Sequence, residues 1–195
     1  MEVAIIDYGA GNVKSVAFAL ERLGVQPKLT KNPEHIAAAD RVIFPGQGAA
    51  QSAMEKLQHH QLERLLPRLT QPVLGICLGM QLLCTQSEEG DTQGLGIIDA
   101  TVTRFNTELK VPQMGWNTIH ELQGPLFAGI PNAVQMYLVH SYYVPIVAET
   151  TATAHYEIPY AVAVAKDNFF GVQFHPEKSS IWGQKVLENF IQLEA

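Results

Sequence analysis

A cysteine between two glycines is the first feature of the sequence that suggests chemistry. An apolar run over residues 72–76 leads into Cys77, Gly75 and Gly79 stand two residues to either side, and helix-like sequence follows. A strand that turns sharply into a helix at such a residue is the nucleophile-elbow pattern, here with cysteine in place of serine. The start of a helix favours the thiolate, and the backbone N–H of Leu78 is placed to donate to an oxyanion. The pattern predicts a nucleophile, and a buried structural cysteine is the alternative.

A cysteine nucleophile needs a base, and the base needs a group that orients it. Of the seven histidines, two follow strand-like runs. His175 is followed by Pro176, which cannot continue a strand, so the chain turns and Glu177 can reach back to the imidazole. We therefore predict a triad of Cys77, His175 and Glu177, with His140 kept as the alternative base.

A second oxyanion donor is expected from a neighbouring strand end. Gly46, Gln47 and Gly48 suit this role, because two glycines let a peptide N–H approach without side-chain obstruction. An ordinary turn is the alternative interpretation. Gln81 lies four residues after Cys77 on the same predicted helix face, where its amide either binds a polar substrate or is exposed.

Two other kinds of site are not supported by the spacing. Cys77 and Cys84 are seven residues apart on one predicted helix, which separates them by about 10 Å, too far for a shared metal ion. The glycines at 9 and 11 lack the third glycine of a dinucleotide fingerprint, because Lys14 takes its place. We expect a tight turn there, and neither a metal nor a cofactor.

The elements that position these residues alternate between strand and helix through about residue 86. Strands are predicted over 3–7, 26–30, 41–44 and 72–76, and helices over 13–23, 32–39, 50–69 with a possible break at Pro67, and 78–85. This alternation predicts a parallel sheet with helices on both faces. Because reactive groups gather at the carboxyl ends of such strands, Cys77, residues 46–48 and residues 9–12 are expected to converge.

The second half of the chain differs, since it has little helix between its strands. Strands are predicted over 101–105, 135–140, 151–156, 161–164 and 169–174, after a polar loop over 87–96, and an amphipathic helix over 181–193 closes the chain. We expect an antiparallel or mixed extension of the sheet. No composition shift marks a second domain, so the prediction is one α/β domain over residues 1–195.

The composition excludes several classes of function. The chain has 195 residues, a net charge of −6 and no block of lysine or arginine, which disfavours nucleic-acid binding. No apolar run is long enough to cross a bilayer, and the first residues read as a strand rather than a signal peptide. Two cysteines make no disulfide framework, so a cytoplasmic protein is expected.

Together these motifs resemble a known family. Residues 75–81 and 174–177 are similar to the class I, or triad, glutamine amidotransferases. Stretches at 7–12, 44–48, 112–117, 137–143 and 171–179 narrow the resemblance to the glutaminase subunits of imidazole glycerol phosphate synthases, of histidine biosynthesis. The resemblance implies an open, mostly parallel flavodoxin-like sheet, and a Cys77 that forms a γ-glutamyl thioester with glutamine while His175, held by Glu177, shuttles protons. It also implies that Gln81 and the backbone of Ser141 and Tyr142 hold the glutamine.

The same resemblance implies a protein partner. Ammonia would pass to a separate cyclase subunit of (β/α)₈ type, which makes imidazole glycerol phosphate and an aminoimidazole carboxamide ribotide. The residues expected to face this partner, in loop turns, are Tyr8, Asn12, Met114, Gly115, Trp116, Asn117 and Lys178. Gln47 departs from the family, which usually has an apolar residue there, so control of the oxyanion loop is expected to differ. The alternatives are a stand-alone cysteine hydrolase or peptidase and a non-catalytic regulatory module.

Overall fold

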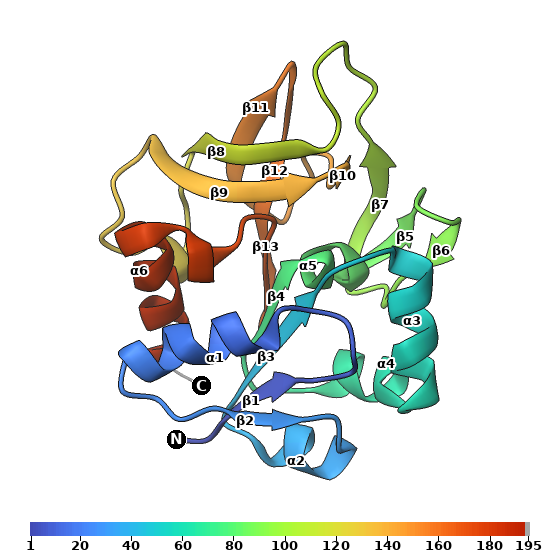
Figure 1. Ribbon diagram of the computed structural model, residues 1–195, viewed down its shortest axis with the longest axis vertical. Helices are drawn as coiled ribbons and strands as arrows, with labels where there is room; N and C mark the ends of the chain where they lie inside the picture. Colours follow the sequence, from blue (N-terminus) through green and yellow to red (C-terminus); the bar gives the residue numbers. More distant parts are fainter. Residues whose placement is uncertain (194–195) are drawn as a thin grey trace.

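The computed structural model describes residues 1–193, and over these residues the chain builds a twisted nine-stranded sheet with helices on both faces (Figure 1). The strand order is β2-β1-β3-β4-β13-β12-β11-β8-β9. The pairs from β2 to β13 are parallel and those from β13 to β9 are antiparallel. The mixed α/β architecture predicted from the sequence is confirmed.

The parallel half is built by the first part of the chain and by one late strand. Its strands are β1 (Val3–Ile6), β2 (Lys28–Thr30), β3 (Arg41–Gly46), β4 (Val73–Cys77) and β13 (Phe169–Val172). Its helices are α1 (Val13–Arg22), α2 (Pro33–Ala38), α3 (Ala50–His59), α4 (Leu62–Leu65) and α5 (Leu78–Leu83), with a 3₁₀ turn η1 at Leu66–Arg68. β13 therefore enters the parallel sheet from about a hundred residues downstream and lies beside the strand that carries Cys77.

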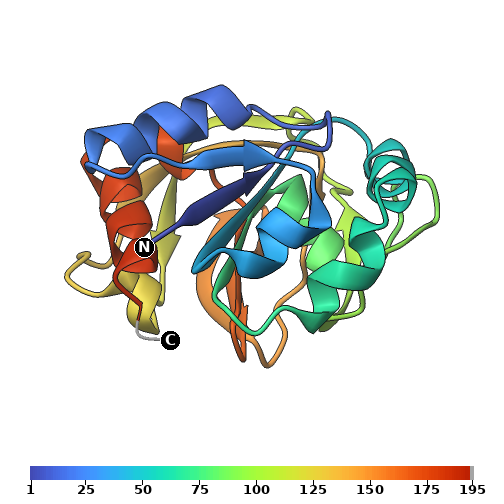
Figure 2. The ribbon, with the colours of Figure 1, turned by 90° about the horizontal axis from the view of Figure 1, so that it is seen from below.

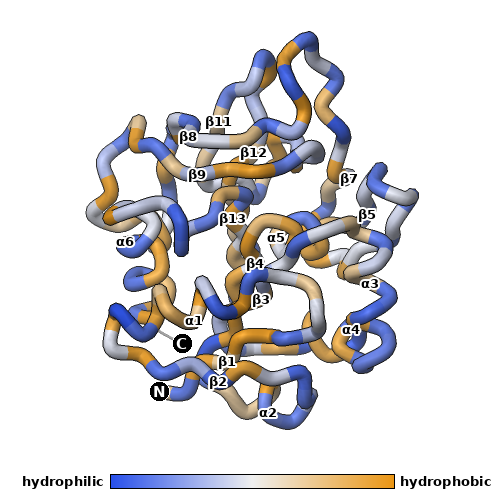
Figure 3. The backbone as a smooth tube through the Cα atoms, viewed as in Figure 1, coloured by the Kyte–Doolittle hydropathy of each residue, from blue (hydrophilic) through white to orange (hydrophobic). Residues whose placement is uncertain are grey.

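Side-chain alternation explains why helices cover both faces of this half. In β1, Val3 and Ile5 join a core with α1 and the last helix, α6 (Ser180–Ile191). Ala4 and Ile6 point the other way, into a core with α2, α3, α4 and α5. Figure 2 shows α1 and α6 on one side of the strands and the other helices opposite, and Figure 3 shows the apolar strands between them. Strands buried on both faces read as continuous apolar runs, which is how they were predicted.

The antiparallel half comes from the second part of the chain. Its strands are β8 (Gln113–His120), β9 (Val134–His140), β11 (Thr150–Tyr156) and β12 (Ile158–Lys166). A smaller sheet in the order β10-β7-β5-β6 is formed by β5 (Cys84–Ser87), β6 (Thr92–Gln93), β7 (Ile98–Arg104) and β10 (Tyr142–Tyr143). Two further 3₁₀ turns are η2 (Pro125–Phe127) and η3 (Pro176–Lys178). No helix among the described residues is long and apolar enough to span a membrane.

Four element predictions were wrong. The segment 87–96, predicted as a polar loop, contains the short strand β6, which pairs with β5. The helix after Cys77 ends at Leu83, so Cys84 begins β5 and the two cysteines do not share a helix. The helix from Ala50 breaks at His60 and Gln61, where Gln61 adopts a left-handed backbone, rather than at Pro67. Residues 114–117 lie within strand β8 rather than in a loop turn. The strand was missed because its polar and glycine residues give no strand pattern, and only the pairing with β9 reveals it.

Candidate functional site

The turn at Cys77 has the strained geometry of a nucleophile elbow. β4 ends at Cys77, α5 begins at the next residue, and the cysteine has φ 55° and ψ −112°. A positive φ in a residue with a side chain costs free energy and is retained where the surroundings enforce it. A Cβ on Gly79 would lie 1.9 Å from the carbonyl oxygen of Phe44, and one on Gly75 would lie 2.8 Å from the Gly79 carbonyl carbon. Glycines therefore let α5 approach the strands closely enough to hold Cys77 in this conformation.

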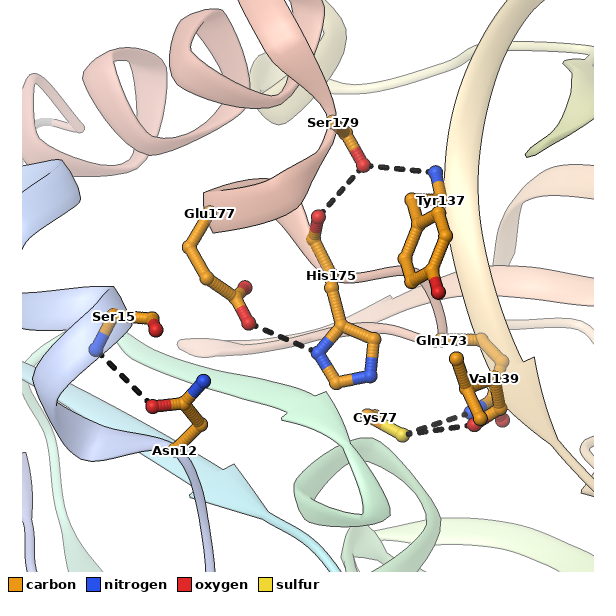
Figure 4. A network of polar contacts seen from close by, with 9 residues as sticks. All are labelled: Asn12, Ser15, Cys77, Tyr137, Val139, Gln173, His175, Glu177 and Ser179. Carbon is orange, nitrogen blue, oxygen red and sulfur yellow. Dashed lines mark hydrogen bonds and ion pairs between the residues drawn. The ribbon is translucent and has the colours of Figure 1, made fainter. Parts of the chain in front are cut away.

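The backbone of His175 is clamped on both sides beyond the end of β13. Its N–H donates to the carbonyl of Tyr137 at 2.9 Å, and its carbonyl accepts from the Ser179 hydroxyl at 2.6 Å. The same hydroxyl accepts from the Tyr137 N–H at 2.9 Å (Figure 4). Ser179 received no role in the sequence analysis, because its contact with β9 joins residues 42 positions apart.

The side chain of His175 lies between Glu177 and Cys77. Its Nδ1 is 3.0 Å from Oε1 of Glu177, and only 5% and 1% of the two side chains are exposed. The other ring nitrogen points toward Cys77 (Figure 4). Burial alone would lower the pKa of His175, but hydrogen bonds and charge interactions with Cys77 and Glu177 outweigh it and raise the pKa to about 9. An imidazole in this position can accept the thiol proton and hold it.

His140 also lies in the site, but both of its ring nitrogens are occupied. Nδ1 is 2.8 Å from the carbonyl of Tyr142, and Nε2 is 3.3 Å from the hydroxyl of Tyr160. Burial lowers the pKa of His140 to about 4, against the opposing effect of the Tyr142 carbonyl. A neutral imidazole that is tied at both nitrogens is poorly placed to act as a base, which favours His175.

The sulfur of Cys77 has further polar neighbours. It lies 3.8 Å from the carbonyl of Val139 and 3.6 Å from Nε2 of Gln173. Gln81 is buried rather than exposed, and its Nε2 donates to the carbonyl of Tyr142 at 2.9 Å and to Oε1 of Gln173 at 2.8 Å. Of these residues, Gln173 was not singled out in the sequence, because a glutamine inside an apolar strand carries no motif of its own.

A cavity of about 440 Å³ opens over the sulfur. Apart from the catalytic candidates Cys77 and His175, its lining residues are Gln47, Gly48, Leu78, Gln81, Glu89, Pro112, Val139, His140, Ser141, Tyr142 and Lys178. The structure thus brings most of the predicted oxyanion and substrate residues to one cavity. Leu78 is the first residue of α5, so its N–H has no intrahelical partner.

The predicted oxyanion loop begins directly beside the nucleophile. Gly46 is the last residue of β3 and pairs in register with Cys77 of β4. A Cβ on Gly46 would lie 2.8 Å from the backbone nitrogen of Gly79 and from Cβ of Leu78, so this strand end needs a glycine. Gly48 has φ +93° and open space around it, which gives the loop the backbone freedom that a repositioned N–H requires.

Glu89 is a cavity residue that the sequence analysis missed. Its Oε2 accepts from the backbone N–H of Ala50, at the start of α3, at 2.8 Å. It lies in the segment that was predicted as a polar loop, where one carboxylate among several polar residues gives no signal. The fold selects it by holding that loop against α3. A carboxylate in the cavity is suited to an ammonium group of a substrate.

Glu177 has one carboxylate oxygen left over. Its Oε2 is buried and has no hydrogen-bond partner within residues 1–193. Glu177 and Asn12 both line a small cavity of about 10 Å³, roughly the space of one water molecule. The Asn12 side chain accepts from the N–H of Ser15 as the cap of α1 (Figure 4). Asn12 is thus close to the triad as well as to the surface.

The residues expected to face a partner differ in how far their side chains are exposed. Met114 and Trp116 are 65% and 51% exposed, respectively. Lys178 lies 6.0 Å above the ring of Tyr137 and also lines the large cavity. Gly115 lies between the two exposed side chains and has φ +127°.

Two of these expected partner residues are occupied within the chain. Tyr8 is 2% exposed and packs against Phe44, and burial followed by the charge of Cys77 raises its pKa. Asn117 donates to the carbonyl of His155 at 3.1 Å. Of the residues expected to face a partner, Met114, Trp116 and Lys178 are therefore the exposed ones, and Tyr8 is not.

Among the described residues, no group of three histidine, cysteine or acidic side chains is arranged to hold a metal ion.

The chain is similar to known proteins along nearly its whole length. The family "Glutamine amidotransferase class-I" matches residues 4–193. The chain is 50% identical to the imidazole glycerol phosphate synthase subunit HisH of Bacteroides fragilis over 99% of this chain and all of that one. It is 45% identical, with the same coverage, to the HisH subunit of Escherichia coli.

Solved structures show the same fold at low sequence identity. The crystal structure of a putative GMP synthase subunit from Thermoplasma acidophilum matches with a TM-score of 0.77 and 18% identity, over 98% of this chain and 92% of that one. A crystal structure described as a glutamine amidotransferase matches with a TM-score of 0.76 and 19% identity, over 97% of both chains. The chain belongs to the class-I glutamine amidotransferase family and, within it, to the HisH subunits of imidazole glycerol phosphate synthase.

Proposed function

We propose that this glutaminase subunit hydrolyses glutamine at Cys77 and supplies ammonia to a cyclase partner in histidine biosynthesis. The observation that carries the proposal is the meeting of Cys77, His175 and Glu177 at one end of the 440 Å³ cavity. A nucleophile, a base with a raised pKa and a buried carboxylate that orients it are the groups that covalent amide hydrolysis requires. The HisH name of the relatives supports histidine biosynthesis as the pathway.

The first half of the reaction forms a thioester. The thiol proton passes to the ring nitrogen of His175 that faces Cys77, and the sulfur attacks the side-chain carbonyl carbon of glutamine. The negative charge that develops on the carbonyl oxygen is stabilised by the N–H of Leu78 and by an N–H of the loop at Gln47 and Gly48. His175 then gives its proton to the leaving nitrogen, the C–N bond breaks, and ammonia departs.

The second half returns the free enzyme. His175 takes a proton from water, the resulting hydroxide attacks the thioester carbonyl, and the C–S bond breaks. His175 then returns its proton to the Cys77 sulfur, and the product leaves as glutamate after its new carboxyl group loses a proton to water. Glu177 holds Nδ1 through both halves, which fixes the ring so that Nε2 faces the sulfur. No metal or cofactor is needed for these proton transfers and bond changes.

Recognition of glutamine is assigned to the other end of the cavity. The Glu89 carboxylate is suited to the α-ammonium group of the substrate, and the backbone at Ser141 and Tyr142 can meet the α-carboxylate. Because Nε2 of Gln81 is occupied by Tyr142 and Gln173, its Oε1 is the atom that remains for the substrate. A ligand with one ammonium, one carboxylate and one amide satisfies these groups.

The partner is assigned as a (β/α)₈ cyclase subunit that docks over Met114, Trp116 and Lys178. Methionine and tryptophan are residue types enriched at protein interfaces, and both side chains are exposed here. Lys178 lies beside them, over the ring of Tyr137 that Trp116 also contacts. Lys178 belongs both to this surface and to the cavity lining, so docking can influence the site directly.

The test is glutamine hydrolysis by the full chain, alone and with the co-purified cyclase partner and its nucleotide ligand. The proposal predicts weak or absent hydrolysis by the chain alone and strong hydrolysis in the liganded complex. A stand-alone cysteine peptidase would instead cleave peptides without the partner, and that result would overturn the proposal.

A further inference from the structure

The buried amide of Gln173 contacts the reactive sulfur. Gln173 is fully buried just beyond β13, and its backbone N–H donates to the carbonyl of Val162 at 2.8 Å. Its side-chain Nε2 lies 3.6 Å from Sγ of Cys77. A buried side-chain amide costs free energy unless its polar atoms are paired. The apolar residues of β13 beside it fill the core without this cost. The amide of Gln173 therefore needs another reason to be there, and its contact with the sulfur of Cys77 supplies one.

Hydrogen-bonding rules fix which end of the amide meets the sulfur. The carbonyl of Tyr142 only accepts, so the Gln81 atom that faces it at 2.9 Å must be the NH₂ group. The second hydrogen of that NH₂ group points to Gln173 at 2.8 Å, so the Gln173 atom there must be oxygen. The NH₂ group of Gln173 therefore faces Cys77. The series of hydrogen bonds from Tyr142 through Gln81 to Gln173 therefore ends in an N–H donor that points at the sulfur.

We propose that Gln173 is a further catalytic residue, whose side-chain N–H donates a hydrogen bond to the Cys77 sulfur and stabilises the thiolate. A donor N–H favours the ionised sulfur over the neutral thiol, because charge-assisted hydrogen bonds are the stronger ones. When the C–S bond of the thioester breaks, the electron pair returns to sulfur, and the same donor assists its departure. A neutral amide also holds its protons, so it does not compete with His175 for proton transfer.

The inference rests on the proposed role of Cys77 and is tested by the pH dependence of its alkylation. Iodoacetamide reacts with the thiolate, so the rate of carbamidomethylation of Cys77 against pH reports its ionisation. In Gln173→Met, which keeps the volume and removes the donor, the midpoint of this profile should rise by about one pH unit, as for one hydrogen bond to an ionised group. Gln173→Asn, which draws the donor back by one methylene, should give a smaller rise.

Two controls separate this effect from loss of structure. Cys84 is fully buried, and burial, followed by the charge of Glu149, raises its pKa to about 12, so its alkylation signals unfolding. Asn189→Ala removes another buried amide, which donates to the carbonyls of Leu126 and Ala128 at 2.9 Å each. Asn189 does not line the cavity over the sulfur, so this variant should leave the midpoint unchanged. If Gln173→Met unfolds, two other variants test the inference. One is Gln173→Asn. The other is Gln81→Leu, which removes the hydrogen bond that orients the Gln173 amide and should also raise the midpoint.

The outcomes distinguish this inference from the proposed function. If the wild-type chain with its partner turns over glutamine but both Gln173 variants keep the wild-type midpoint, Gln173 has only a packing role and the inference fails. If the wild type forms no adduct at Cys77 with the glutamine analogue 6-diazo-5-oxo-norleucine, the proposed function fails instead. The inference is supported if the alkylation midpoint is highest in Gln173→Met, intermediate in Gln173→Asn and lowest in the wild type.

Discussion

Oε1 of Glu177 lies 3.0 Å from Nδ1 of His175. Only Pro176 separates the two residues in the chain, so the backbone must turn sharply for their side chains to meet. The turn that makes this possible is η3, which starts at Pro176 and is closed by the Lys178 N–H donating to the His175 carbonyl at 3.0 Å. Both side chains are almost completely buried. A short sequence motif thus supplies the base together with its orienting group.

Glu177→Gln should lower kcat for glutamine hydrolysis by up to about 10²- to 10⁴-fold, the usual contribution of a positioned acid–base group, because His175 loses the carboxylate that orients it, with little change in KM. The amide keeps the shape of the carboxylate but removes the charge that helps to raise the pKa of His175. Steady-state kinetics of the complex measure this. Glu188→Gln is the matched control, because Glu188 pairs with Lys185 at the surface. Equal losses in both variants would contradict the assignment.

The two histidines of the site should respond differently to substitution. His175→Ala is expected to abolish turnover in the complex, whereas His140→Ala should leave a measurable rate. The reason is that His175 faces both the sulfur and Glu177, while the nitrogens of His140 are held by Tyr142 and Tyr160. Single-turnover assays on the two variants decide the matter, and the opposite ranking would identify His140 as the base.

Gly79→Ala should destabilise the chain, by about 1–3 kcal/mol or more, because its Cβ would fall 1.9 Å from the carbonyl oxygen of Phe44 and force α5 away from β3. Chemical denaturation measures the change in the free energy of unfolding. Gly24→Ala is the comparison, since Gly24 has φ +78° but open space and costs backbone strain alone. If the two variants lose the same stability, close packing at the elbow is not what requires glycine.

Trp116→Ala should weaken binding of the cyclase partner roughly tenfold or more, as expected for an interface tryptophan, while the fold stays intact. Trp116 is half exposed and stacks edge-on against Tyr137, with ring centroids 6.0 Å apart. Phe18→Ala removes an aromatic side chain of similar exposure, 58%, on α1. Calorimetric titration should show weaker partner binding for Trp116→Ala and unchanged binding for Phe18→Ala. Weaker binding for Phe18→Ala alone would mean that the partner docks on α1 rather than over Trp116.

The sequence predicted much of the parallel half because β1, β3 and β4 are buried, mostly apolar runs and because the end of α1 and the start of α2 carry recognisable stop and cap residues. Asn32 and Pro33 at the start of α2 are one such signal, and the Asn32 side chain indeed accepts from the N–H of Glu34. The triad candidates share this property, since each lies in a local motif. The HisH identity followed from motifs that run along nearly the whole chain.

The remaining features depend on contacts between distant residues. β8 was missed because only its pairing with β9 and β11 makes it a strand. Ser179 and Glu89 reach the site through backbone contacts with Tyr137 and Ala50, 42 and 39 positions away. The burial of Tyr8 likewise depends on a distant residue, Phe44 of β3, whose ring packs against it. Such relationships leave no local pattern for a single sequence to show.

The most direct measurement of the central claim is the site of covalent labelling by 6-diazo-5-oxo-norleucine in the complex with the cyclase partner. This glutamine analogue should alkylate Cys77, which opens into the cavity beside His175, and spare Cys84, which is fully buried. Peptide mapping by mass spectrometry should then find one adduct, on Cys77, with loss of glutaminase activity in proportion to labelling. An intact Cys77 in a fully treated complex would contradict the assignment of this residue as the nucleophile.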